Sequence, residues 1–345
     1  MGGKRPSVRT VLLVVFAFLA AGFSATPASA APTDPPLIAS CLSQHVPSSA
    51  YTPAGWFESR TEWCRNSTLQ AAEVGNGAGE FVARATIGVT TSPRDLHVHV
   101  DVKITVVSAT GTLANPFLEI QLPCGGCTPG AARGRGATLS EWKTNGYASF
   151  DFVGKTGGGS DKAAKHKFHP RFILNQGIVR DGAEGMFRCD AYTSVSKTVQ
   201  GCVFPQDIPT LLYHVLSKGR DAVLHIQDAL NHPNSTEPKW TGEDAGKKTI
   251  PRFLHRLVNP SKQRANARAA KKVCLAIDAH YTSKGEECDE YPFQSTEEGA
   301  NKGDKRFSAR PIIASENSSA GGTLSAFYAS YRILNGDEFQ VAVAP

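Results

Sequence analysis

Apolar and polar residues alternate in two neighbouring segments of the first half of the chain. From Ala83 to Val89, and again from Leu96 to Val106, every second side chain is apolar. Side chains two positions apart lie on the same face of a strand, so both segments predict half-buried β-strands. Glycine-rich turn sequences such as GKTGGGSDK, at 154–162, follow them. We therefore expect antiparallel strands packed as a sandwich or a barrel.

The pattern changes near residue 200. Apolar residues recur at helical spacing over 209–230, a polar insert occupies 231–248, and the end of the chain, 339–343, is β-rich again. A chain of 345 residues is also longer than most single domains. The predicted fold class is α+β, with an antiparallel β-rich domain of unknown role and unknown ligand at 31–200 and a second domain at 201–345.

The first 30 residues have the composition of a secretory signal peptide. Lys4, Arg5 and Arg9 precede an apolar run from Val11 to Phe23, and Ala28-Ser29-Ala30 forms a small-residue cleavage site. A membrane anchor needs about 20 apolar residues, more than this run supplies. We expect removal of residues 1–30, a secreted, extracellular mature chain and no membrane association after processing.

Overall composition excludes several classes of protein. With 41% hydrophobic and 20% charged residues, the chain is neither wholly disordered nor a coiled-coil rod. The formal net charge is +6, and half of it lies in the first 30 residues. A histone-like polycation is therefore excluded, and any contact with nucleic acid must come from a local patch.

All eight cysteines lie after the signal sequence, and an even number in an oxidising compartment favours disulfides. The spacing of Cys124 and Cys127 also occurs in thioredoxin-like motifs and zinc sites, but neither a βαβ pattern nor a second similar pair accompanies it. Pairing of sequence neighbours predicts the disulfides Cys41–Cys64, Cys124–Cys127, Cys189–Cys202 and Cys274–Cys288.

A basic stretch and an acidic stretch follow one another in the second half of the chain. Nine cations between Lys247 and Lys272 are uninterrupted by Asp or Glu, which suits contact with phosphates, although such runs are usually solvated helix faces. Then come four carboxylates within ten residues, Asp289, Glu290, Glu297 and Glu298. Carboxylate oxygens suit Mg²⁺ or Mn²⁺, so the pair of stretches is compatible with cleavage of phosphodiester bonds.

The string CDEYPFQSTEEGA, at 288–300, resembles the signature of secreted bacterial deoxyribonucleases of the NucA/NucB type. Further segments resemble that family in the same order, and the resemblance extends from Cys202 to Val343. These segments are His225–Leu230, Arg264–Arg268, Ser308–Arg310, Ser315–Gly321, Phe327–Tyr328 and Arg332–Asp337.

The resemblance implies a fold similar to that of the small ββα-metal nucleases, with one Mg²⁺ or Mn²⁺ ion. It implies Glu290 as the metal ligand, Asp289 beside it, and Glu298 and Asn317 as further catalytic residues. It implies phosphate contacts for His225, Arg268 and Arg310. Structural roles remain open: Asp289 could cap a helix, Asn317 could hold a turn, and His225 could be a packed helix residue.

Two positions depart from the family pattern. Asn259 stands where the family tends to have an Asp that could serve as acid or base, and an amide cannot take up a proton near pH 7. Asp278 or Asp289 could substitute for it. Ala267 also separates Asn266 from Arg268, and Ser318 follows Asn317 where the family often has Arg.

The sequence thus predicts a secreted, metal-dependent, monomeric endonuclease that contacts the DNA backbone and has little sequence specificity. Two alternatives remain open. One is a secreted binding protein with a catalytically weakened nuclease-like domain, and the other is a secreted nuclease toxin.

Overall fold

The computed structural model describes residues 34–43, 54–75, 78–130, 134–159, 161–175, 177–181, 184–192, 200–241 and 248–345. The predicted signal peptide and Lys247 lie outside these ranges. The α-helices are α1 (Pro36–Leu42), α2 (Leu139–Thr144), α3 (Arg220–Asn231), α4 (Pro260–Ile277) and α5 (Ala314–Ser330), and the short 3-10 helices are η2 (Gly111–Leu113), η3 (Pro233–Ser235), η4 (Tyr281–Lys284) and η5 (Ala300–Lys302). Among the described residues, none of the helices is long and apolar enough to cross a membrane.

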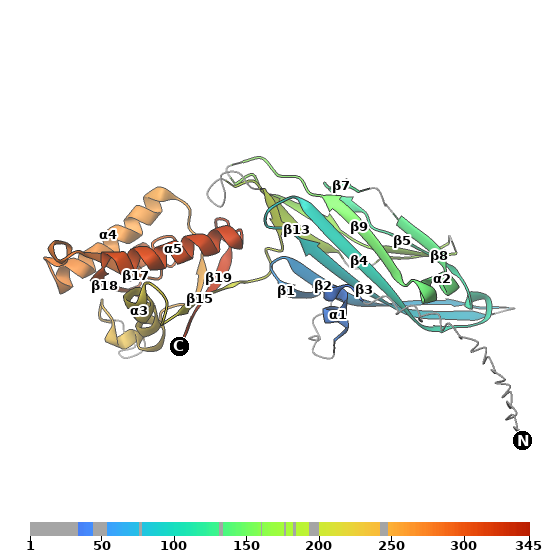
Figure 1. The fold of residues 1–345 in the computed structure, drawn as a ribbon, viewed down its shortest axis with the longest axis horizontal. Coiled ribbons are helices and arrows are strands. Elements are labelled where there is room, and N and C mark those ends of the chain that lie inside the picture. Colours follow the sequence, from blue (N-terminus) through green and yellow to red (C-terminus); the bar gives the residue numbers. More distant parts are fainter. Residues whose placement is uncertain are drawn as a thin grey trace, which may run out of the picture. The chain divides into compact units, whose positions relative to one another are not determined.

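The strands fall into two groups along the chain (Figure 1). The first group is β1 (Trp56–Ser59), β2 (Glu62–Glu73), β3 (Gly79–Thr91), β4 (His97–Ala109), β5 (Phe117–Gln121), β6 (Cys124–Gly125), β7 (Thr128–Pro129), β8 (Gly134–Thr138), β9 (Tyr147–Val153), β10 (Ala164–Phe168), β11 (Arg171–Leu174), β12 (Ile178–Asp181), β13 (Gly185–Asp190) and β14 (Gly201–Val203). The second is β15 (Thr210–His214), β16 (Phe253–His255), β17 (Glu286–Tyr291), β18 (Ser308–Ile313) and β19 (Glu338–Ala344).

The first group forms antiparallel sheets, as the alternating pattern predicts. Their strand orders are β1-β2-β3-β4-β9-β7, β14-β13-β10-β6 and β12-β11-β5-β8. On β4, Val98, Val100 and Val102 are buried while His97 and His99 are exposed, which confirms the period of two. The inward side chains of these sheets share one apolar core, so the predicted α+β class with a β-rich first part is confirmed.

The helix predicted from the apolar spacing over 209–230 is wrong in its first half. Residues 210–214 form β15, which pairs in parallel with β19, and α3 begins only at Arg220. Leu211 and Tyr213 are buried, whereas Leu212 is 47% exposed. Burial therefore alternates with a period of two, and Gly219, with φ of 90°, separates the strand from the helix.

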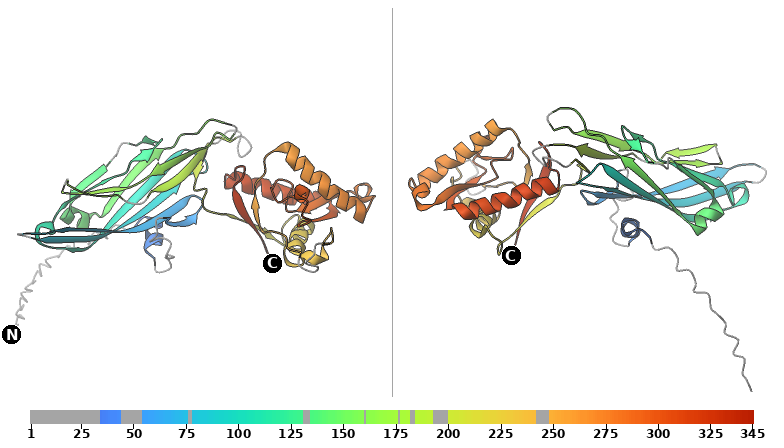
Figure 2. Two further views of the ribbon diagram at one scale, coloured as in Figure 1. Left: turned by 180° about the vertical axis from the view of Figure 1, so that it is seen from behind. Right: turned by 45° about the horizontal axis from the view of Figure 1, so that its top comes forward.

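Strands β17 and β18 pair as a two-stranded antiparallel sheet, and α5 begins directly after β18. One face of this sheet packs on α4, where Ala270 and Cys274 meet Cys288 and Ala309. On the other face, Tyr291 and Ile312 join a core that includes side chains of α3 and α5. Helices α4 (orange in Figure 2) and α5 (red) thus lie on opposite faces of the same small sheet.

The cysteines are joined in four sequence-local pairs, Cys41–Cys64, Cys124–Cys127, Cys189–Cys202 and Cys274–Cys288. The last pair links α4 to β17, one residue before Asp289.

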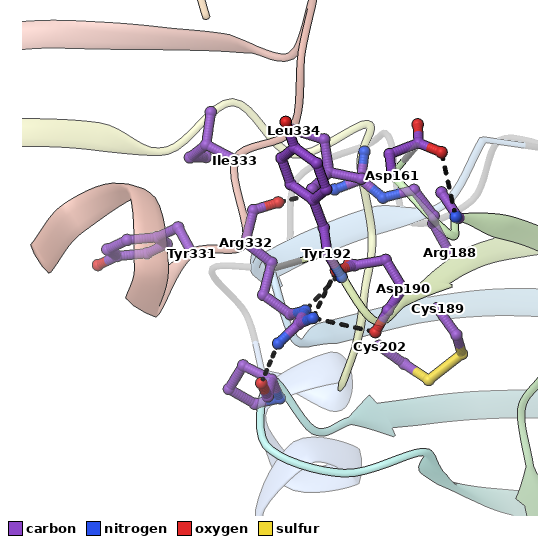
Figure 3. Close-up of polar contacts among 12 residues, drawn as sticks. Asp161, Arg188, Cys189, Asp190, Tyr192, Cys202, Tyr331, Arg332, Ile333 and Leu334 are labelled. Atoms are coloured by element: carbon purple, nitrogen blue, oxygen red, sulfur yellow. Dashed lines mark hydrogen bonds and ion pairs between the residues drawn. A yellow bond between two sulfur atoms is a disulfide. The ribbon is translucent and has the colours of Figure 1, made fainter. Parts of the chain in front are cut away.

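A buried ionic network joins the β-rich part to the turn after α5. Arg332, 1% exposed, donates from Nε to the Asp190 carboxylate at 3.0 Å and from Nη1 to the Pro93 carbonyl at 3.0 Å. Figure 3 shows Arg332 reaching Asp190 beside the Cys189–Cys202 disulfide. Arg188 donates to the Arg332 carbonyl at 2.7 Å.

Asp337, in the same turn, accepts from two further arginines of the β-rich part. Arg188 lies 2.7 Å from one of its carboxylate oxygens, and Arg60 lies 2.6 Å from the other. Residues Pro35–Pro345 form one compact unit. The domain boundary near residue 200 therefore stays a prediction.

Candidate functional site

A cavity of about 670 Å³ lies beside β17, between α4 and α5. Strand β17 contributes the acidic part of its wall, α4 a polar and cationic part, and α5 a small-residue part. The residues that carry polar groups into it are Arg256, Gln263, Lys271, Glu287, Asp289, Glu290, Gln294, Ser295, Asn317, Ser325 and Tyr328. Of the predicted site residues, Asp289, Glu290 and Asn317 are therefore brought together here.

Asp289 is held by a chain of buried hydrogen bonds. Its Oδ2 lies 2.6 Å from Nδ1 of His225, on α3, and Nε2 of His225 lies 2.7 Å from Oγ of Ser308, on β18. His225 is 0% exposed and Ser308 is 1% exposed. With both ring nitrogens engaged, His225 fixes the orientation of Asp289. Its contact with phosphate stays a prediction.

Glu290 has different surroundings, although it is the next residue. Burial raises its pKa to about 8, and the neighbouring Asp289 carboxylate acts in the same direction. The backbone N–H of Gln294 donates to Glu290 Oε1 at 3.2 Å and partly opposes this increase. Without a cation, the surroundings therefore favour the protonated form of Glu290 more than they would for an exposed glutamate.

Asn317 and Arg256 complete the wall of the cavity from two sides. Asn317, on α5, donates from Nδ2 to Glu287 at 3.0 Å, so Glu287 is a third carboxylate of the cavity. Arg256 is buried, lies 4.4 Å from the ring of Tyr328 and donates to the carbonyl of Ile333. Burial lowers the pKa of Arg256.

The other predicted site residues lie outside this cavity. Glu298 accepts from His255 at 2.8 Å (ring Nδ1) and 2.9 Å (backbone N–H), and this pairing raises the pKa of His255. Arg310 pairs with Asp228 at 2.9 Å. Arg268 is exposed on α4 and does not line the cavity.

The two departures from the family pattern have structural explanations. Asn259 caps α4, because its side chain accepts from the N–H groups of Ser261 and Lys262 at 3.0 and 3.1 Å. It does not line the cavity. Asn266 is buried and donates to the carbonyls of Gln294 and Thr296 at 2.9 and 3.1 Å, so it anchors the loop after β17.

Sequence reasoning missed Glu287 and Gln263, and it included Arg256 and Lys271 in the basic stretch without assigning them to the site. Gln263 and Lys271 lie eight residues apart with Ala267 between them, and this spacing places them on one face of a helix. That signal was available in the sequence. Nothing local indicated that the face would lie opposite β17, because that depends on how α4 packs.

The donor set fits a hard divalent cation. No group of three or more His, Cys, Asp or Glu side chains with metal-binding geometry occurs among the described residues. Mg²⁺, however, commonly uses one or two carboxylates and takes its other ligands from water and phosphate. Burial, and after it the neighbouring Asp289 carboxylate, raises the pKa of Glu290, and a bound cation would offset both effects on the charged form.

Comparison with known proteins agrees with the resemblance noted in the sequence. No curated protein and no solved structure matches the chain. Residues 243–342 match the sequence profile of the deoxyribonuclease NucA/NucB family. The matched range includes α4, β17, β18 and α5, and thus every residue that lines the cavity except Ile226. The chain is therefore similar to deoxyribonucleases of the NucA/NucB type over residues 243–342.

Proposed function

We propose that the chain is a secreted, metal-dependent endonuclease that hydrolyses phosphodiester bonds of DNA with little sequence preference. The observation that carries the proposal is the position of Asp289 and Glu290. They are adjacent carboxylates in one cavity, inside a domain that matches a deoxyribonuclease family. The succession β17, β18, α5 supports the further proposal that this is a ββα-metal type of site.

Glu290 and Asp289 are the residues that would hold the cation. When bound, Mg²⁺ or Mn²⁺ supplies positive charge to the phosphoryl oxygens and makes a coordinated water more acidic. His225 keeps the Asp289 carboxylate in one orientation, and Ser308 keeps His225 in place. Arg256 and Lys271 place positive charge on the cavity wall, where a phosphate group would enter.

Low sequence preference follows from the kind of contact proposed. Lys and Arg contacts to phosphates position a nucleic acid without reading its bases. Export is supported by the sequence of residues 1–30 and by the four disulfides, which persist in oxidising surroundings.

The test is cleavage of supercoiled plasmid by the full chain with Mg²⁺ or Mn²⁺, with and without excess chelator. We expect nicking that stops in chelator and falls at least 100-fold in Glu290→Gln and Asp289→Asn. Glu297→Gln is the matched control, since Glu297 is an exposed carboxylate of the next turn outside the cavity. Undiminished cleavage in chelator, or by Glu290→Gln, would refute the mechanism. DNA that is retarded on a gel but remains uncut would instead indicate a binding protein.

A further inference from the structure

Four cations of α4 lie on one side of the helix. Arg264, Arg268, Lys271 and Lys272 are all exposed. At about 100° per residue, their positions around the helix axis fall within an arc of about 100°. We call these four residues the basic stripe.

The basic stripe borders the cavity. Gln263, Ala267 and Lys271 line the cavity from α4, and Lys271 belongs to both sets. Arg264 and Arg268 lie three residues before the lining residues Ala267 and Lys271. Side chains three apart are neighbours on a helix surface, so both arginines lie beside the cavity wall on the exposed side of the helix.

The charges of the basic stripe are not neutralised within the described part of the chain. Exposed lysines elsewhere form ion pairs, as Lys284 does with Asp278 at 2.5 Å and Lys167 with Glu184 at 2.8 Å. Among the described residues, no ion pair involves a member of the basic stripe. The sequence from 248 to 272 also contains no Asp or Glu.

The carboxylates of the cavity make positive charge next to it favourable for binding a polyanion. Glu287, Asp289 and Glu290 concentrate carboxylates at the point where a phosphodiester would be cut, and like charges repel at this range. The acidic part of the cavity wall therefore does not by itself attract a polyanion. Fixed positive charge directly beside the cavity would offset the repulsion and hold the strand on either side of the cut bond.

We propose that the basic stripe is the surface along which the substrate backbone runs into the cavity, an inference that rests on the proposed nuclease function. From Arg264 to Lys272 the helix rises about 12 Å, at 1.5 Å per residue. Each strand of a duplex has one phosphate per about 3.4 Å of the duplex axis, so this length, laid along that axis, spans about three to four of them. The ligand is a nucleic acid backbone, recognised by its charge.

The experiment compares the full chain with the triple variant Arg264→Gln, Arg268→Gln, Lys272→Gln. None of the three substituted residues lines the cavity. Steady-state cleavage and binding to a fluorescent oligonucleotide are each measured from 50 to 300 mM KCl. The binding assay contains Ca²⁺ or chelator in place of Mg²⁺ or Mn²⁺, so that the oligonucleotide is not cut. We expect KM and Kd to rise about tenfold while kcat changes less than twofold. The slope of log K against log salt should decrease by about 2.7 for a duplex or about 2.1 for a single strand.

Lys262→Gln is the matched control. Lys262 is an exposed lysine of the same helix, but it lies about 160° from Arg264 and about 120° from Arg268 around the axis. It should leave KM and the salt slope unchanged. If the triple variant and Lys262→Gln behave alike, the basic stripe is a solvated face and the inference is wrong, although the nuclease activity would stand. If the unsubstituted chain cuts no DNA in any metal, the proposed function itself fails.

Discussion

Asp289 and Glu290 show how two neighbouring carboxylates receive different properties from their surroundings. Asp289 has a buried histidine partner at 2.6 Å, which fixes the orientation of its carboxylate. Glu290 lies in the same cavity and accepts a hydrogen bond from the backbone N–H of Gln294, and burial raises its pKa to about 8. The sequence indicated that both residues matter. It could not assign these different roles, because His225 is 64 residues away along the chain.

The first residue-scale prediction concerns the pH dependence of stability without metal. The pKa of Glu290 is about 8 in the folded chain and near 4.5 when unfolded, so the folded state binds this proton more tightly. Its contribution to stability is therefore complete below about pH 4.5 and is lost as the pH rises towards 8. We expect the free energy of unfolding of the unsubstituted protein to fall by roughly 1 to 3 kcal/mol between pH 5 and pH 8, relative to that of Glu290→Gln. Urea titrations in the presence of chelator would measure both values.

Addition of Mn²⁺ at pH 8 should restore the stability of the unsubstituted chain and stabilise Glu290→Gln much less, because only the unsubstituted chain has both proposed ligands. Parallel stability curves for the two proteins would contradict the raised pKa.

The second residue-scale prediction concerns His225. The variant His225→Gln keeps a polar side chain but cannot reproduce both ring hydrogen bonds, so Asp289 loses its fixed orientation. Partners of this kind typically contribute 10- to 100-fold to activity or metal affinity, and we expect a loss of about that size. Cleavage rates over a Mn²⁺ titration would measure it, with melting temperatures recorded in parallel. Impaired cleavage by Ser308→Ala together with normal cleavage by His225→Gln would contradict the role of His225 in orienting Asp289.

At the scale of elements, α4 combines three tasks in one helix. Its buried side packs on β17 and β18, Asn266 anchors the loop after β17, and the adjoining side lines the cavity. Gly299 passes so close to Asn266 that a Cβ there would collide with its amide. Any change to the orientation of α4 would therefore also move the loop that follows β17.

Asn259 provides the element-scale prediction. Because its side chain caps α4 outside the cavity, Asn259→Asp should retain the cap and change the cleavage rate less than twofold. Asn259→Ala should destabilise the protein by about 1 kcal/mol, measured by urea unfolding. A large gain in activity for Asn259→Asp would show instead that this position takes part in proton transfer.

The elements also show where sequence reasoning succeeds. Strands β3 and β4 are predictable because one face is buried and the other exposed, which leaves a period of two in the sequence. The segment at 210–214 was misassigned because Leu211, Leu212 and Val215 also satisfy a helical spacing. Its pairing partner, β19, is more than 120 residues away, and only tertiary structure reveals it. For the same reason, Glu298 was grouped with Asp289 and Glu290 although it pairs with His255.

At the scale of the whole molecule, the β-rich part and the C-terminal part depend on each other through buried charges. Arg332 and Asp190 are 1% and 0% exposed, so either would be left as an uncompensated buried charge if the other were removed. The family match covers residues 243–342. It therefore includes Arg332 and Asp337, but not Asp190, which pairs with Arg332, nor Arg60 and Arg188, which pair with Asp337.

We predict that Asp190→Asn destabilises the chain by about 3 to 5 kcal/mol and lowers activity, because Arg332 loses its counter-ion. The double variant Asp190→Asn, Arg332→Met should be more stable than Asp190→Asn alone. Urea unfolding followed by tryptophan fluorescence would measure both. Glu184→Gln is the control, since it breaks an exposed ion pair and should cost less than about 1 kcal/mol. Equal effects of Asp190→Asn and Glu184→Gln would show that the two parts are energetically independent.

The bond between Cys274 and Cys288 ties the cationic helix to the strand that carries the acidic groups. Such a bond does not persist in a reducing cytosol. In the cytosol, α4 and β17 of a newly made chain would be held together by packing alone. If the chain is exported as proposed, the cross-link between α4 and β17 would form only outside the cytosol, and the proposed nuclease would lack it while still inside the producing cell.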